Sequence, residues 1–104
     1  MVQLKWEQYY KSESELIQAL LKVNTKVYKK LSSYLKGYEF LEGFQNYYNK
    51  NGFLSDRQIY TLKKLLAENI YKYNKYGHIE GNKFYYEIGI NGATGENLYK
   101  IINL

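Results

Sequence analysis

Apolar side chains recur at helical spacing through most of the first three-quarters of the chain, and the pattern is sharpest between residues 51 and 73. Ser55 and Gln58 have the spacing of a capping box, in which each side chain accepts a hydrogen bond from the backbone amide of the other residue. We therefore expect a helix from Asp56 to about Asn74. Its predicted buried stripe consists of Ile59, Leu62, Leu65, Leu66, Ile70 and Tyr73.

A second helical pattern lies upstream, between about Ser12 and Lys36. Ser12 and Glu15 again have capping-box spacing, and Gly37 follows the last helical position as a terminator. Because the apolar residues are separated by steps of three and four, the pattern predicts one long, continuous helix. The predicted core stripe is Leu16, Leu20, Val23, Val27, Leu31 and Tyr34.

Between these two helices, the pattern predicts a shorter helix from about Tyr38 to Lys50. Asn51 and Gly52 close it, because glycine readily adopts the left-handed conformation that ends helices. Gly43 lies inside it, where glycine costs roughly 1 kcal/mol relative to alanine, so we expect a neighbouring helix to approach closely there. The predicted apolar side consists of Phe40, Leu41, Phe44, Tyr47 and Tyr48.

The last quarter of the chain has the pattern of strands and turns. Residues 83–90 and 98–104 are rich in aromatic and β-branched side chains, so they predict two antiparallel strands. The glycine-rich residues 91–97 between them predict a hairpin loop longer than two residues. Residues 78–80 are a candidate for a further short strand, with Gly81-Asn82 as its turn.

At the other end of the chain, Val2, Leu4 and Trp6 alternate with polar residues. This period of two predicts a half-buried strand, which needs partner strands from elsewhere in the chain. A frayed helical start is the alternative for this segment.

Together these elements predict an α+β fold in a single domain that spans residues 1–104. It consists of a short N-terminal strand, three helices and a C-terminal antiparallel β-hairpin, with all the strands in one small sheet. The alternative is a winged-helix-like arrangement, with Asp56–Asn74 as the recognition helix and the Asn91–Asn97 loop as the wing.

Tyrosine is the unusual feature of the composition, because 14 of the 104 residues are Tyr and only four are Phe. A tyrosine buries its ring while keeping a polar tip, so it suits half-buried positions and interfaces equally well. An A/T-rich genome is the alternative source of the excess, since Lys, Asn, Tyr and Ile all have A/T-rich codons.

The chain is basic, with a formal net charge of +5. This excess fits polyanion binding and also plain solubility. Apart from Arg57, every cationic side chain is a lysine, which attracts phosphate well but reads base edges poorly. If nucleic acid is the partner, we therefore expect little sequence specificity.

Residues for catalysis and metal binding are scarce. The chain has no Cys and a single histidine, His78, so we expect no metal site and no cofactor. Ser12 and Ser55 are accounted for as helix caps, and the glycine-rich residues 92–95 lack the lysine and following helix of a phosphate loop. We therefore expect a protein that is not an enzyme. No apolar run is long enough to span a membrane, so we expect no membrane partner.

Two surfaces combine the residue types that nucleic acids require. On the predicted first helix, five lysines fall within an arc of roughly 120°, taking about 100° per residue. On the predicted third helix, tyrosines alternate with lysines along one side, as in a surface that stacks bases and binds phosphates. A solvated outer face is the alternative for both. The candidate binding residues are Lys22, Lys26, Lys29, Lys30, Lys36, Tyr60, Lys64, Tyr71 and Lys75.

Residues 40–66 resemble a small helical module of bacteriophage and mobile-element proteins. That module has an aromatic helix, a glycine, then Leu-Ser/Thr-x-x-Gln and a leucine-rich helix. The matching residues are Phe44, Gly52, Leu54, Ser55, Gln58, Leu62 and Leu65, which together span about a quarter of the chain. The resemblance implies a phage-type protein that acts near nucleic-acid machinery. In size and single-domain build, the chain is also similar to small phage inhibitors of host defence of the anti-CRISPR type.

We therefore expect a small, non-enzymatic binding protein that acts on nucleic acid or a nucleoprotein complex through its Lys/Tyr surface. The alternative is a protein-directed inhibitor of a host defence complex, which binds through a tyrosine-rich surface. Self-association into a homo-oligomer is a third possibility. The expected location is the cytoplasm, that of the host cell if the protein is encoded by a phage.

Overall fold

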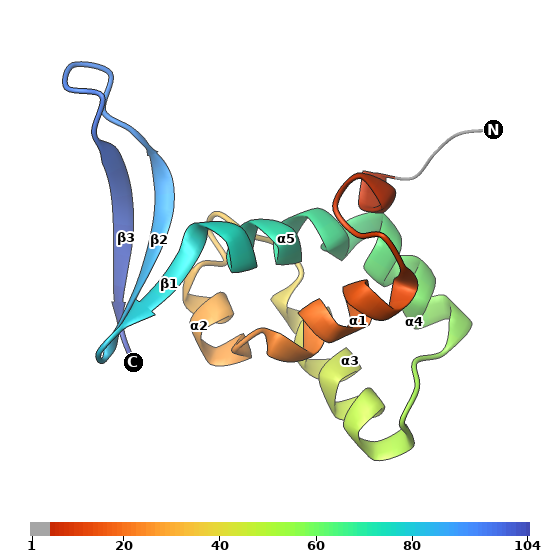
Figure 1. Cartoon of the computed structure of the whole chain (residues 1–104). Helices are drawn as coiled ribbons and strands as arrows, with labels where there is room; N and C mark the ends of the chain where they lie inside the picture. Colours follow the sequence, from red (N-terminus) through yellow and green to blue (C-terminus); the bar gives the residue numbers. More distant parts are fainter. Residues whose placement is uncertain (1–4) are drawn as a thin grey trace.

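The computed structural model describes residues 5–104 and has an α+β fold (Figure 1). The helices pack together as one body, and an antiparallel sheet with strand order β1-β2-β3 projects from one side of it. In chain order, the elements are the 3₁₀ turn η1 (Lys5–Gln8), α1 (Glu13–Lys22), α2 (Thr25–Lys30), α3 (Tyr38–Asn51), α4 (Asp56–Thr61), the π-helical turn η2 (Leu62–Leu66), α5 (Ala67–Tyr76), β1 (Gly77–Glu80), β2 (Lys83–Ile90) and β3 (Asn97–Asn103).

The predicted N-terminal strand is not present in the described part of the chain. Val2 and Leu4 lie outside the described residues, and Trp6 belongs to the 3₁₀ turn η1. Trp6 packs against the helical core, and its ring lies 4.7 Å from the Nζ of Lys63. Trp6 therefore packs on the helices, and its backbone forms a helical turn instead of a strand.

The prediction of one long helix from Ser12 to Lys36 is wrong, because the helix breaks after Lys22 and restarts at Thr25. Asn24 caps the new helix, since its Oδ1 accepts hydrogen bonds from the amides of Lys26 (3.1 Å) and Val27 (3.3 Å). The end of α1 is satisfied from α3, where Gln45 Nε2 donates to the carbonyls of Leu20 and Val23, each at 2.8 Å.

Because of this break, the last residue of the predicted core stripe is not the one that is buried. The α-helix ends at Lys30, and turns continue the chain to Leu35. Leu35 is buried, whereas Tyr34, which was predicted to be in the core, is 50% exposed. Because the helical phase ends early, the apolar side chain reaches the core from the neighbouring position.

The third predicted helix begins as expected and runs two residues further, to Tyr76. The capping box is present: the Gln58 amide donates to Ser55 Oγ (3.2 Å), and the Ser55 amide donates to Gln58 Oε1 (2.9 Å). The prediction that Leu65 is buried is wrong, because its side chain is 58% exposed while Leu66 is buried. The π-helical turn η2 contains both residues, and its wider spacing rotates Leu65 away from the core.

The C-terminal hairpin of β2 and β3 is confirmed, and the candidate strand at residues 78–80 forms β1. Gly81 and Asn82 make a two-residue turn, in which Gly81 has the positive φ that type II′ turns require at this position. The loop at residues 91–96 lies at the far tip of the hairpin, away from the helices (Figure 1). The winged-helix alternative is therefore not adopted, because the predicted wing does not lie beside α4 and α5.

A ladder of aromatic rings joins the sheet to the helical body. The ring of Tyr73 on α5 lies 5.2 Å from that of Phe84 on β2 in a stacked arrangement, and 5.6 Å from that of Tyr28 on α2. Gly77 makes room for this contact, because a Cβ there would overlap the Phe84 ring. All three rings are buried, so one core extends from the helices to the base of the sheet.

Gly37 and Gly43 differ in how closely their surroundings approach the backbone. Gly37 has φ +87°, and a Cβ there would overlap the side chain of Leu66, so both its conformation and its surroundings require glycine. Gly43 is exposed, and a Cβ there would meet nothing within 4 Å. The expected close approach of another helix at Gly43 is therefore wrong.

The neighbouring leucines of η2 provide a direct stability test. We predict that Leu66→Ala lowers the free energy of unfolding by roughly 2–5 kcal/mol, because it removes a buried side chain and leaves a cavity. Leu65→Ala should cost under about 1 kcal/mol, since most of this side chain is in contact with water. Urea denaturation of the two variants measures the difference, and equal decreases would show that the π-helical turn is absent in solution.

Candidate functional site

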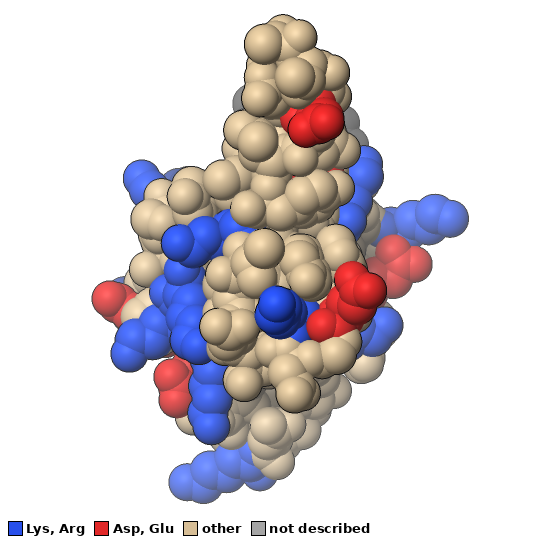
Figure 2. Space-filling view, turned by 90° about the vertical axis from the view of Figure 1, so that its left-hand side faces the viewer, with Lys and Arg blue, Asp and Glu red and all other residues tan. Residues whose placement is uncertain are grey.

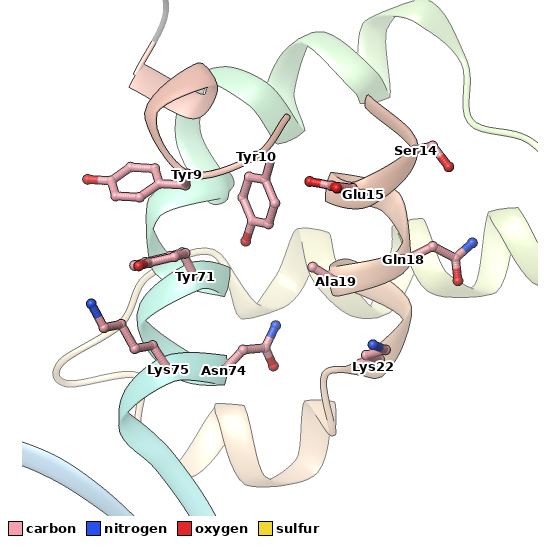
Figure 3. A pocket seen from close by; sticks show the side chains of 10 residues that line it. All are labelled: Tyr9, Tyr10, Ser14, Glu15, Gln18, Ala19, Lys22, Tyr71, Asn74 and Lys75. Atoms are coloured by element: carbon pink, nitrogen blue, oxygen red, sulfur yellow. The ribbon is translucent and has the colours of Figure 1, made fainter. Parts of the chain in front are cut away.

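An open groove lies between α1 and α5, with a volume of about 690 Å³ (Figure 3). One wall comes from α1 and the other from α5, while the segment between η1 and α1 closes one end. The groove is lined by Tyr9, Tyr10, Ser14, Glu15, Gln18, Ala19, Lys22, Tyr71, Asn74 and Lys75.

Three tyrosines form the aromatic end of this groove. The rings of Tyr9 and Tyr71 lie 4.7 Å apart with their planes tilted by 36°, and Tyr10 meets Tyr71 edge-on at 6.3 Å. Tyr10 is buried, and its hydroxyl donates to the carbonyl of Ala67 (3.3 Å). Tyr9 and Tyr71 are half-buried, so parts of their rings remain available to a ligand.

Two lysines stand on opposite walls of the groove. Lys22 is the last residue of α1, and Lys75 lies in the last turn of α5 (Figure 3). The Nζ of Lys75 lies 5.4 Å from the centre of the Tyr71 ring, within range of a cation–π interaction. A hydrogen bond with Tyr71 raises the pKa of Lys75, so this ammonium keeps its charge at neutral pH.

Carboxylates also lie near the aromatic end of the groove, where Lys75 approaches the Tyr71 ring. Glu15 Oε2 accepts a hydrogen bond from the amide of Lys11 (3.0 Å) at the start of α1. The pKa of Tyr9 is raised mainly by burial. The negative charge of Glu68 and a hydrogen bond with Glu68 raise it further. Glu68 also pairs with Lys72 at 3.4 Å. The aromatic end of the groove therefore carries both signs of charge, with Lys75 beside Tyr71 and the Glu68–Lys72 pair beside Tyr9, while Lys22 lies on the wall formed by α1.

A second hollow, of about 290 Å³, continues the groove to the base of the sheet. Lys22 and Asn74 line both hollows, and His78 and Ile79 of β1 line the second. Basic side chains outnumber acidic ones on the face that the sheet presents in Figure 2. An extended ligand therefore has a continuous path from the tyrosines, past the lysines, to the sheet.

The fold brings together only part of the predicted binding surface. Lys22, Tyr71 and Lys75 share the groove. Tyr60 and Lys64 do not line it and instead contact each other, with Lys64 Nζ 5.5 Å from the Tyr60 ring.

The predicted arc of lysines on the first helix is divided by the break at Asn24. Lys22 ends α1, Lys26, Lys29 and Lys30 lie on α2, and Lys36 lies beyond its end. Lys29 Nζ is 5.4 Å from the Tyr38 ring, and Lys30 Nζ donates to the carbonyl of Asn103 (3.0 Å). The expectation of one lysine ridge on a single helix is therefore wrong.

Four further groove residues, Tyr9, Tyr10, Gln18 and Asn74, were not predicted from the sequence. Tyr9 and Tyr10 lie in a segment for which no element was predicted, so no helical phase assigned their direction. A usable signal was present, because two adjacent aromatic residues shortly before a cap at Ser12 are placed to fold back over the helix that follows.

Within residues 5–104, no cluster of three or more potential metal ligands occurs. In that same range, no helix combines the length and apolar character that a membrane span requires. The groove therefore offers aromatic faces, amides, hydroxyls, ammonium groups and the carboxylate of Glu15 as its binding chemistry.

Comparison of the chain with protein-family models, curated proteins and solved structures finds no match. The resemblance of residues 40–66 to a phage helical module stays a prediction.

Two buried tyrosines predict how stability changes at alkaline pH. Burial raises the pKa of Tyr10 and of Tyr28 above the ordinary value near 10. The folded state thus holds these protons more tightly than the unfolded state, so their contribution is complete below about pH 10 and is lost as the pH rises further. We predict that Tyr10→Phe and Tyr28→Phe each flatten the decline of unfolding free energy between about pH 9.5 and 11.5.

Denaturation with urea across this pH range measures the slope. The comparison uses slopes rather than absolute stabilities, because each substitution also removes a hydroxyl that donates to a backbone carbonyl, that of Ala67 for Tyr10 and that of Lys36 for Tyr28. The unfolding free energy of the double variant should depend less steeply on pH than that of either single variant. Slopes identical to that of the unmodified chain would show that neither phenol is buried in solution.

Proposed function

We propose that this protein is a non-enzymatic binding protein for single-stranded nucleic acid, which it holds in the groove between α1 and α5. The observation that carries the proposal is the presence of Lys22 and Lys75 on opposite walls of a groove whose end is formed by Tyr9 and Tyr71. Positive charge along a groove together with exposed aromatic faces is the combination that proteins use to bind single strands.

The two residue types supply different parts of the affinity. Lysine attracts phosphate as a point charge, and neutralising phosphates releases counterions, which makes such binding weaken as salt rises. A base stacked on a tyrosine contributes roughly 1–3 kcal/mol, largely independent of its identity. Because the groove contains no arginine, we expect weak discrimination between sequences.

The lining of the groove favours one path for the strand. The exposed faces of Tyr9 and Tyr71 accept a base, and Lys75 beside Tyr71 binds the adjoining phosphate, while Glu15 disfavours a phosphate at its own position. The phosphates then lie between Lys22 and Lys75 and continue towards the sheet. Gln18 and Asn74 line this path with amide groups that donate hydrogen bonds.

The first test measures binding to short, single-stranded DNA and RNA by fluorescence anisotropy at two salt concentrations. We predict that Lys22→Gln with Lys75→Gln weakens binding and makes its salt dependence shallower, by about 0.7 for each phosphate that is no longer neutralised. Lys50→Gln is the matched control, because Lys50 is an exposed lysine of α3 outside the groove.

Tyr71→Ala should weaken binding without changing the salt dependence, since stacking releases few counterions. Its melting temperature must be compared with that of Tyr73→Ala, which removes a core ring. The absence of binding at low salt, or equal effects of the groove and control lysines, would contradict the proposal.

A second candidate function is protein-directed inhibition of a host defence complex, as in the anti-CRISPR class. It is favoured by large aromatic side chains that are exposed on the helical body, since aromatic residues are enriched at protein interfaces. These residues are Tyr34, Phe40, Phe53, Tyr60 and Tyr76. Under this function, the chain would occlude a protein surface without needing the groove.

The second candidate predicts a distinct result in a pull-down from a bacterial lysate treated with nuclease. One stoichiometric protein should remain bound, and Phe40→Ser with Phe53→Ser should release it, while Lys22→Gln with Lys75→Gln should not. Loss of all partners after nuclease treatment would instead contradict protein-directed inhibition and favour nucleic-acid binding.

A further inference from the structure

The hairpin that projects from the helices exposes an unusual amount of apolar surface. On β2 and β3 both faces carry large exposed aliphatic or aromatic side chains, in contrast to the buried Phe84 and Ile102 of the same strands. Contiguous surface of this kind generally marks an interaction site. The exposed side chains from this hairpin to the end of the chain are Ile88, Ile90, Leu98, Tyr99, Ile101 and Leu104.

One edge of the sheet, strand β3, has backbone groups that point outward. The amide of Leu104 donates to the carbonyl of Asn82 (2.8 Å), which shows that the even-numbered residues of β3 bond to β2. The N–H and C=O groups of Tyr99, Ile101 and Asn103 therefore face away from β2. The hydrogen bond from Lys30 Nζ to the Asn103 carbonyl agrees with this direction.

This edge has little of the usual protection against pairing. Natural edge strands are blunted by proline, by charged side chains or by a covering element. The chain has no proline, and the charged residue of β3 is Lys100. Within the described residues, the bond from Lys30 to Asn103 is the one hydrogen bond from a side chain to β3, and it leaves the backbone of Tyr99 and Ile101 open.

We propose that a second copy of this chain pairs antiparallel with β3, about a two-fold axis at Ile101, so that two three-stranded sheets become one. In this register the outward groups of Ile101 bond to those of the other Ile101, and Tyr99 bonds to Asn103 of the other copy. Roughly four main-chain hydrogen bonds form across the axis without involving the Asn103 carbonyls. Two more form if each Asn103 carbonyl, which already accepts from Lys30, uses its second lone pair.

The side chains favour this register because the strand is complementary to itself. Leu98 lies opposite Leu104 of the other copy on one face, and the two Ile101 side chains meet on the other face. A shift of the axis by one residue, to Lys100, would place two lysines directly opposite each other, which is destabilising. Self-complementarity identifies the occupant as a second copy rather than an unrelated strand.

The charge of the chain gives this pairing a characteristic salt dependence. Each copy carries a formal charge of +5, so the two copies repel each other until salt screens them. Pairing through β3 therefore strengthens as salt rises, whereas binding of nucleic acid weakens. The pairing is independent of the groove function, and the opposite responses to salt distinguish the two.

The experiment uses the absence of cysteine from the chain to place a single reporter on the axis. In the proposed register, the two residues at position 101 have Cα atoms about 5.5 Å apart, which suits a disulfide. Ile101→Cys should therefore cross-link to a dimer under mild oxidation, faster at high salt. Ile79→Cys, a similarly exposed position on the opposite edge strand, is the matched control and should stay monomeric.

Light scattering of the cysteine-free chain over a range of concentrations measures the association itself. Ile101→Pro removes an outward N–H that makes no bond to β2, so a folded, monomeric variant supports the proposal. If that variant fails to fold, Ile101→Lys tests the same edge by charge. A chain that stays monomeric at all concentrations, or cross-linking at position 79 equal to that at position 101, overturns the proposal.

Discussion

The stacking of Tyr73 on Phe84 is the interaction on which the arrangement of this molecule depends. It holds the sheet against the helices, and it also sets the rotation of α5 about its axis. Tyr71 and Lys75 lie four residues apart on one side of that helix, and Tyr73 lies on the opposite side. Burial of the Tyr73 ring therefore turns Tyr71 and Lys75 to the outer side of α5, where Tyr71 packs against Tyr9 and Lys75 packs against Tyr71. The same contact that completes the core thus also sets one wall of the groove.

The other wall depends on where α1 ends. Because Gln45 bonds to the last carbonyls of α1 and Asn24 restarts the chain as α2, Lys22 is left at a helix terminus beside Asn74. A continuous helix would have carried its lysines along one outer ridge. The break instead separates them, so that one lysine faces the groove while Lys30 reaches the edge of the sheet.

The sequence predicts most of the element types, because local signals specify them. Ser55 and Gln58 form their capping box, and Gly81-Asn82 forms its turn. The break at Asn24 could not be predicted from the apolar spacing, since the residue that accommodates it, Gln45, is about twenty positions away. The exposure of Leu65 depends on a π-helical turn, which shifts the helical phase without any change in the apolar pattern.

The candidate site was predictable only in part, for a related reason. Tyr71 and Lys75 were found because their helix was well specified, and Lys22 because it lies on α1. Tyr9 and Tyr10 reach the groove because the N-terminal segment folds back over η2 and α5. The spacing of apolar residues within one helix gives no information about such a long-range contact. Pattern therefore identified the faces of single helices but not the pairing of two helices.

Because the hairpin is attached to the helices by its base alone, the two ends of the hairpin differ in how well they tolerate substitutions. Gly37 and Gly77 are fixed by close contacts, and Phe84 and Ile102 by burial, so substitutions there affect the whole fold. The tip at residues 91–96 lies beyond the core and is closed by its own hydrogen bonds, such as that from the Asn91 amide to the Glu96 carbonyl (2.7 Å). Selection can therefore alter the tip, in sequence or in length, while the helical body continues to fold unchanged.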